Sequence, residues 1–218
     1  VTYLQPDSDG RITLDVLKAA LRKDTILVSV MMVNNEVGSV MPIAQMAKLT
    51  HKICPSAIFH TDAVQGFLKI PFAAKTLGAD LISISSHKVH GPKGAGALYI
   101  SPKLKSFPAL LIGGGQESGR RGGTENVPYI MGLAKAMELA QEKMADNARL
   151  ITLRDRLIAE LTKIPYSRLN GHPTERLPGN VNVCFEGIEG ESLLLLLDDK
   201  GIAASSGSAC TSGSLDPS

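Results

Sequence analysis

The sequence has few aromatic residues and cysteines, no long apolar run and little net charge. Each of these features argues against a particular class of protein. Three widely spaced cysteines do not form a disulfide framework, so we expect a reducing, cytoplasmic setting. No apolar run approaches the roughly 20 residues that a membrane span requires. A formal net charge of +2 gives no electrostatic reason to expect nucleic acid or an anionic membrane as a partner. Aromatic residues, 4% of the chain, do not interleave with Arg120 and Arg121, so this pair is thin support for a nucleic-acid contact.

The composition is that of a soluble globular protein, with 44% hydrophobic and 20% charged residues. Short β-branched apolar runs alternate with segments of helical spacing over the first hundred residues. This rhythm predicts an α/β fold built on a doubly wound, mainly parallel sheet. The strands are expected over residues 26–33, 57–61, 81–84 and 97–100, and the helices over residues 14–23, 42–53 and 72–77.

The pattern changes after the glycine-rich segment 112–126. Residues 129–164 have helical spacing, with a break expected near Asp146 and Asn147, and they precede a strand over 180–185 and a helix over 191–199. We therefore predict two domains: a large one over residues 1–135, and a smaller α+β domain over residues 136–218 that is incomplete.

Lys88 stands directly after a predicted buried strand, between His87 and His90, in the stretch LISISSHKVHGPKGAGALYI. A lysine without this context is usually a solvated surface residue. The loops that follow the carboxyl ends of strands are, however, where open α/β sheets bind ligands. A partly desolvated amine at such a place is a candidate nucleophile or carbonyl-binding group.

Polar side chains follow two other predicted strands in the same way. Carried to one edge of a parallel sheet, the three clusters would converge on a single pocket, and that pocket would suit pyridoxal phosphate. Its aldehyde needs an amine, its ring nitrogen a carboxylate, its phenolate oxygen hydrogen-bond donors, and its phosphate hydroxyl or imidazole groups. The candidates are, in that order, Lys88, Asp62, Asn35 with Gln65, and Ser85 with His87.

Four ordered motifs resemble the successive signatures of cysteine desulfurases, which are fold type I pyridoxal-phosphate enzymes of the class V aminotransferase family. The motifs are HTDAVQ, SISSHKVHGPKGAGALY, GGGQESGRRGGTEN and SSGSACTSGSLDPS. The resemblance implies the same cofactor roles for the residues just named. It also implies that Thr124 reaches a cofactor phosphate across the interface of a homodimer.

Cys210 lies in a run of small residues, SSGSACTSG, that has no apolar period. By resemblance its thiolate takes the sulfur of L-cysteine, leaving L-alanine and a protein persulfide for an iron–sulfur scaffold or another acceptor protein. Whether Cys210 also serves as a transient iron–sulfur ligand is left open. Because the thiolate is the reactive form, local activation of Cys210 is expected.

The resemblance also defines what this chain does not match. Family members carry a preceding portion with a phosphate-binding loop and a ring-stacking histidine, and an arginine after the cysteine loop that binds the substrate carboxylate. We therefore expect a partial chain. The alternatives are a selenocysteine lyase, which shares nearly the same pocket, a class V aminotransferase, which has no use for Cys210, and a non-catalytic interaction module.

Two histidines and two cysteines are given structural interpretations. His87 and His90 have the spacing H-x-x-H but lack a third ligand, so no metal site is predicted. Cys54 and Cys184 are expected to be buried packing residues and not reactive thiols.

Overall fold

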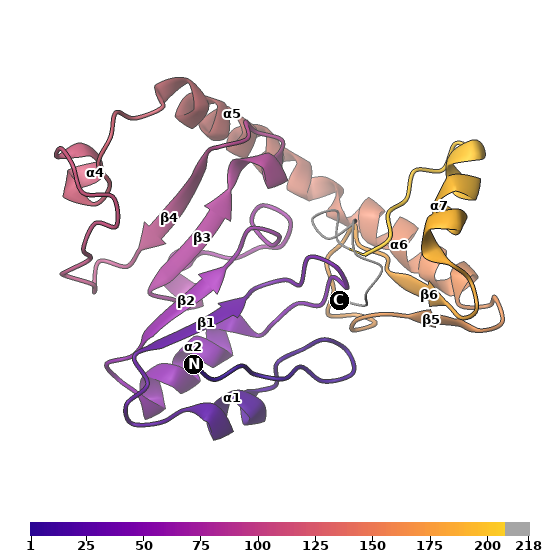
Figure 1. Ribbon diagram of the computed structural model, residues 1–218, viewed down its shortest axis with the longest axis horizontal. Helices are drawn as coiled ribbons and strands as arrows, with labels where there is room; N and C mark the ends of the chain where they lie inside the picture. The colour runs from indigo at the N-terminus through magenta and orange to yellow at the C-terminus, as the bar shows by residue number, and fades with distance from the viewer. Residues whose placement is uncertain (208–218) are drawn as a thin grey trace.

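The computed structural model describes residues 1–207 (Figure 1). Its larger part is built around a four-stranded sheet. Its strands follow the chain order β1-β2-β3-β4. The first three strands run parallel and β4 runs antiparallel to β3, so the prediction of a mainly parallel sheet is confirmed. The bounds are β1 Leu27–Met31, β2 Ile58–Asp62, β3 Leu81–Ser85 and β4 Gly96–Ile100.

Helices α1 (Leu14–Ala20) and α2 (Ile43–Ile53) lie beside the first two strands, and α3 (Ala74–Leu77) precedes β3 (Figure 1). Thr13 caps α1, since its hydroxyl accepts the backbone N–H of Val16 at 3.2 Å. Pro42 stands at the start of α2, where the missing N–H costs no intrahelical bond. Fully buried apolar side chains, including Phe59, join the helices to the sheet in one core.

Strand β1 is buried on one face only. Val28 and Val30 enter the core, whereas Leu27, Ser29 and Met31 are exposed. Successive side chains of a strand point to opposite faces of the sheet. The helices that pack on β1 and β2 cover the face that holds Val28 and Val30.

A long helical region leads away from the sheet, as predicted. Helix α4 (Gln116–Gly119) lies in the glycine-rich segment and is followed by α5 (Val127–Lys143). A short 3₁₀ turn, η2 (Met144–Asp146), interrupts the region before α6 (Asn147–Leu161), which confirms the predicted break. The Asn147 side chain donates to the backbone carbonyl of Lys69 at 2.9 Å, so the break is fixed to the loop that follows β2.

The chain beyond α6 forms a two-stranded antiparallel sheet and one more helix. These elements are β5 (Ser167–Leu169), β6 (Val183–Phe185) and α7 (Gly190–Asp199), at the end of the molecule opposite α4 (Figure 1). The division into domains at residue 135 stays a prediction. No helix within residues 1–207 is both long and apolar enough to cross a membrane.

Candidate active site

The carboxyl ends of β1, β2 and β3 meet at one edge of the sheet. Met31 stands beside Asp62, and Asp62 stands beside Ser83 in the parallel register. The loops that begin there carry Asn35, Asp62 with Gln65, and Ser85 with Lys88. The three predicted clusters therefore leave neighbouring strands at the same edge.

Lys88 lies in a 3₁₀ turn, η1 (Ser86–Val89), directly after β3. The carbonyl of Ser86 accepts the N–H of Gly91, and His90 adopts a left-handed conformation with φ 66° that reverses the chain. A Cβ on Gly91 would collide with the Ser86 hydroxyl, so this tight turn needs glycine. The turn leaves the Lys88 side chain half-buried.

Ser85 and His87 lie next to each other at the start of this turn. The Ser85 hydroxyl and His87 Nδ1 are 2.8 Å apart. Ser85 is half-buried and His87 is exposed. A hydroxyl and an imidazole in contact form a compact donor pair that suits a phosphate group.

Asp62 ends β2 with its side chain half-buried. One carboxylate oxygen accepts the backbone N–H of Val64 at 2.8 Å, which fixes the rotamer of the carboxylate at the sheet edge. A carboxylate held in this way is suited to pair with a protonated ring nitrogen.

A row of hydrogen bonds crosses the sheet two residues before Asp62. His60 Nδ1 is 2.8 Å from the Ser29 hydroxyl, and His60 Nε2 is 2.9 Å from the Ser83 hydroxyl. Burial lowers the pKa of His60, and the negative charge of Asp62 opposes that shift. Sequence reasoning missed His60, although its position two residues before Asp62 on a strand places both side chains on one face.

Gln65 and Lys69 lie in the loop after β2, and both are half-buried. Lys69 Nζ donates to Gln65 Oε1 at 3.2 Å. Burial lowers the pKa of Lys69, and the positive charge of Lys88 lowers it further. Lys69 was not among the predicted site residues. Its spacing of four from Gln65 was the available signal.

The pKa of Lys69 is expected to rise when Lys88 is replaced by methionine. The substitution removes the nearby positive charge, while burial continues to hold the pKa below its usual value. Titration of the lysine side-chain NMR signals measures the change. Lys93→Met, at an exposed position of the same loop, serves as the control. An unchanged Lys69 pKa in Lys88→Met would contradict the electrostatic contact between the two lysines.

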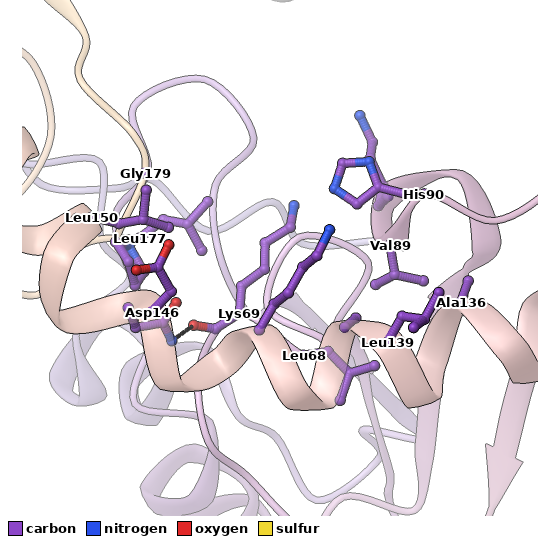
Figure 2. Close-up of a pocket in the computed structure, with 15 residues that line it drawn as sticks. Leu68, Lys69, Val89, His90, Ala136, Leu139, Asp146, Leu150, Leu177 and Gly179 are labelled. Carbon is purple, nitrogen blue, oxygen red and sulfur yellow. Dashed lines mark hydrogen bonds between the residues drawn. The ribbon is translucent and has the colours of Figure 1, made fainter.

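A cavity of about 580 Å³ opens beside Lys88, within the size range of small-molecule sites. It lies between the η1 turn, helix α5 and the turn over residues 177–179. Figure 2 shows Lys69 extending toward the side of this cavity where His90 lies, with Val89, Ala136 and Leu139 gathered on an apolar side. The lysine predicted to bind the cofactor thus borders a concave site with both basic and apolar walls.

Asn35 is exposed in the loop that follows β1. Its neighbour Glu36 offers a carbonyl that accepts the side-chain amides of Asn180 at 3.0 Å and Asn182 at 3.2 Å. The loop that carries Asn35 is therefore held by residues almost 150 positions further along the chain, which sequence reasoning did not foresee.

Arg176 holds the same loop from a buried position, with 4% of its surface exposed. Burial and the positive charge of Arg154 lower the pKa of Arg176. The guanidinium is hydrogen-bonded mainly to backbone carbonyls, which offset part of the cost of burying its charge. These carbonyls belong to Val37 at 3.0 Å and to Asn170, His172 and Asn180 at 3.2 Å.

Among the described residues, Lys88 is the only predicted site residue that lines the cavity. The lining residues do not include Asn35, Asp62, Gln65, Ser85 or His87. Thr124 is exposed in the stretch between α4 and α5 and is not among the residues that line the cavity. Cys210 lies outside the described residues.

Of the other two cysteines, Cys54 is buried as predicted, and its thiol donates to the Arg22 carbonyl at 3.0 Å. Cys184 is exposed, which makes that prediction wrong. It sits on β6 of a two-stranded sheet and points to a face that no described element covers. Within residues 1–207 no three His, Cys, Asp or Glu side chains are arranged to hold a metal ion.

Comparisons with known proteins identify the family of this chain. Residues 1–217 match the family described as aminotransferase class-V. The chain is 55% identical to the cysteine desulfurase IscS of Methanosarcina thermophila and 53% identical to cysteine desulfurase 2 of Trichormus variabilis. It is covered completely in both cases but spans only 54% of each relative's length.

Solved structures agree with the sequence relatives. A NifS-like protein matches 94% of this chain with a TM-score of 0.87 at 40% identity, and 56% of that protein is covered. The structure of SspA in complex with cysteine matches all of this chain with a TM-score of 0.78 at 34% identity, over 60% of that protein. These matches confirm the expected fold type I architecture and the expectation of a partial chain, and the chain belongs to the class V aminotransferase family, whose cysteine desulfurases depend on pyridoxal phosphate.

Proposed function

We propose that this chain carries part of an L-cysteine desulfurase that depends on pyridoxal phosphate. The observation that supports it most is the placement of Lys88. Lys88 is half-buried and lines a cavity directly after a parallel strand, and a carboxylate, Asp62, ends the neighbouring strand at the same edge. The names of the relatives at 55% and 53% identity support the reaction.

The residues at this edge fit the cofactor by their chemistry. Lys88 would bind the aldehyde carbon, Asp62 the ring nitrogen, Asn35 and Gln65 the phenolate oxygen, and Ser85 with His87 the phosphate. When bound, the cofactor withdraws electrons from the substrate's α-carbon, which labilises bonds at that carbon and eases loss of the sulfur at the next one.

The protein groups then have separate tasks. Asp62, whose carboxylate is held by the Val64 N–H, would pair with the ring nitrogen. Lys88 would be the amine placed to move protons at the substrate. The apolar wall of the cavity, including Val89 and Leu139, limits the access of water.

Cys210 would complete the reaction. The Cβ–S bond of L-cysteine breaks, a sulfur–sulfur bond to the Cys210 thiolate forms, and Cβ gains a proton to give L-alanine. The sulfur is oxidised and the carbon reduced, so no external oxidant is needed. The resulting persulfide would pass to an acceptor such as an iron–sulfur scaffold protein. In the complex with such a protein, Cys210 would also serve as a transient ligand of the cluster.

A homodimer in the cytoplasm is part of the proposal. Large apolar side chains are exposed on both sides of Thr124 in the chain, with Leu110 at 93%, Ile112 at 92% and Met131 at 63% of their surface. Such a concentration of exposed apolar residues is typical of a protein interface. A second copy seated there would bring Thr124 to a cofactor phosphate.

Product analysis tests the proposed reaction. With pyridoxal phosphate and L-cysteine, a full-length protein that contains this chain is expected to form alanine and to gain one sulfur on Cys210. Cys210→Ser is expected to lose the protein persulfide and to form alanine at least ~100-fold more slowly, because the sulfur acceptor is gone. Mass spectrometry and alanine quantification provide the measurements.

Cys184→Ser is the matched control, since Cys184 is an exposed thiol on β6. Equal persulfide in Cys210→Ser and the unaltered chain would contradict the assignment of Cys210. Turnover of selenocysteine without turnover of cysteine would indicate a selenocysteine lyase. A folded full-length protein that forms no alanine would favour a non-catalytic interaction module.

A further inference from the structure

Lys69 is a half-buried lysine that is held at both its side chain and its backbone. Its Nζ donates to Gln65 Oε1 at 3.2 Å, and its carbonyl accepts the Asn147 side chain at 2.9 Å. The second contact joins Lys69 to the break between α5 and α6. Lys69 therefore has a fixed backbone from which it reaches Gln65.

The contact with Gln65 has a chemical direction. A glutamine amide has a carbonyl oxygen that only accepts hydrogen bonds and an NH₂ group that only donates them, and a lysine ammonium can only donate. Lys69 therefore fixes the carbonyl side of the amide toward itself. The NH₂ group must then lie on the other side, away from Lys69.

We propose that Lys69 is a positioning residue that orients the Gln65 amide so that its NH₂ group donates to the cofactor's phenolate oxygen. The inference rests on the proposed function, because it assigns Gln65 to that oxygen. An amide without such a contact has two orientations separated by a half-turn, and only one of them presents a donor. Lys69 selects the donor orientation before the cofactor binds.

Lys143 allows this role to be separated from a general effect of positive charge. Lys143, on α5, and Lys69 both line the cavity beside Lys88. Removing either lysine takes one positive charge from the cavity wall. Only Lys69 is assigned the orienting contact with Gln65.

The orientation is measured first, without cofactor. We expect the NMR order parameter of the Gln65 side-chain amide to be high in the unaltered chain and to fall below about 0.6 in Lys69→Met. Lys69→Arg keeps a donor and is expected to restore at least part of the order. Lys143→Met is expected to leave it unchanged. An equally ordered amide in Lys69→Met would overturn the inference, and a folded Lys69→Arg variant keeps the test open if Lys69→Met does not fold.

The functional effect is measured as pyridoxal phosphate affinity. Lys69→Met is expected to raise the dissociation constant about threefold to tenfold, the effect of one oriented hydrogen bond. Gln65→Ala is expected to raise it similarly. In the double variant, Lys69→Met should add less than about twofold to the effect of Gln65→Ala, because Lys69 acts through Gln65.

The outcomes separate this inference from the proposed function. Fully additive effects of the two substitutions, or an equal loss of affinity in Lys143→Met, would overturn the positioning role while leaving the desulfurase proposal intact. A chain that binds no pyridoxal phosphate in any variant would overturn the proposed function and the role of Lys69 toward the cofactor. The order parameter would still decide whether Lys69 orients Gln65.

Discussion

Replacing Lys88 with alanine is expected to abolish the visible absorption band that pyridoxal phosphate gives on binding. Alanine formation from L-cysteine should fall by roughly a thousandfold or more, because the variant loses the one amine that is proposed both to hold the aldehyde and to move protons. Absorption spectra and alanine quantification measure the two losses. Lys93→Ala is the control, at an exposed position five residues later in the same loop.

Three lysines, Lys69, Lys88 and Lys143, line the cavity, so the amine that binds the cofactor has to be identified directly. Borohydride reduction fixes the cofactor to the amine that binds its aldehyde, and peptide mass spectrometry locates it. We expect the adduct on Lys88 and none in Lys88→Ala. An adduct on Lys69 would contradict the assignment of Lys88, because Lys69 lines the same cavity.

Replacing Arg176 with methionine is expected to lower the free energy of unfolding by about 3–5 kcal/mol. The side chain is 4% exposed, and its removal leaves carbonyls of Val37 and Asn170 without this donor. Urea denaturation measures the loss. Hydrogen exchange should also accelerate in the loop over residues 34–39, which carries Asn35.

Arg156→Met on α6 is the matched control for this substitution. Arg156 is exposed, and removing its charge is expected to change the free energy of unfolding by no more than about 0.5 kcal/mol. Similar losses in both variants would mean that the buried guanidinium has no special role. Faster exchange in Arg176→Met without a loss of stability would confine its effect to the loop.

Local patterns predicted most of the elements and the placement of Lys88. Thr13 starts a helix because its hydroxyl caps a neighbouring N–H, and the apolar run before Ser85 forms a strand because it is short and β-branched. Each of these causes acts over a few residues. The convergence of Asp62 and Lys88 at one edge followed from parallel pairing alone.

The residues that sequence reasoning missed act over long separations or depend on what covers a surface. Arg176 reaches the Val37 carbonyl across 139 positions, and no periodic pattern marks such a contact. Cys184 lies in an apolar run, yet its side of a two-stranded sheet is open. Lys69 reads as an ordinary lysine until the structure shows its bond to Gln65.

The contact between Arg176 and the loop after β1 also bears on synthesis at the ribosome. The carbonyl of Val37 is made 139 residues before the guanidinium that binds it. At about 5–20 residues per second, the loop that carries Asn35 waits roughly 7–28 seconds for its partner. Lys88 and Asp62 emerge well within that interval. A nascent chain would thus present the amine and the carboxylate first and secure the Asn35 loop last.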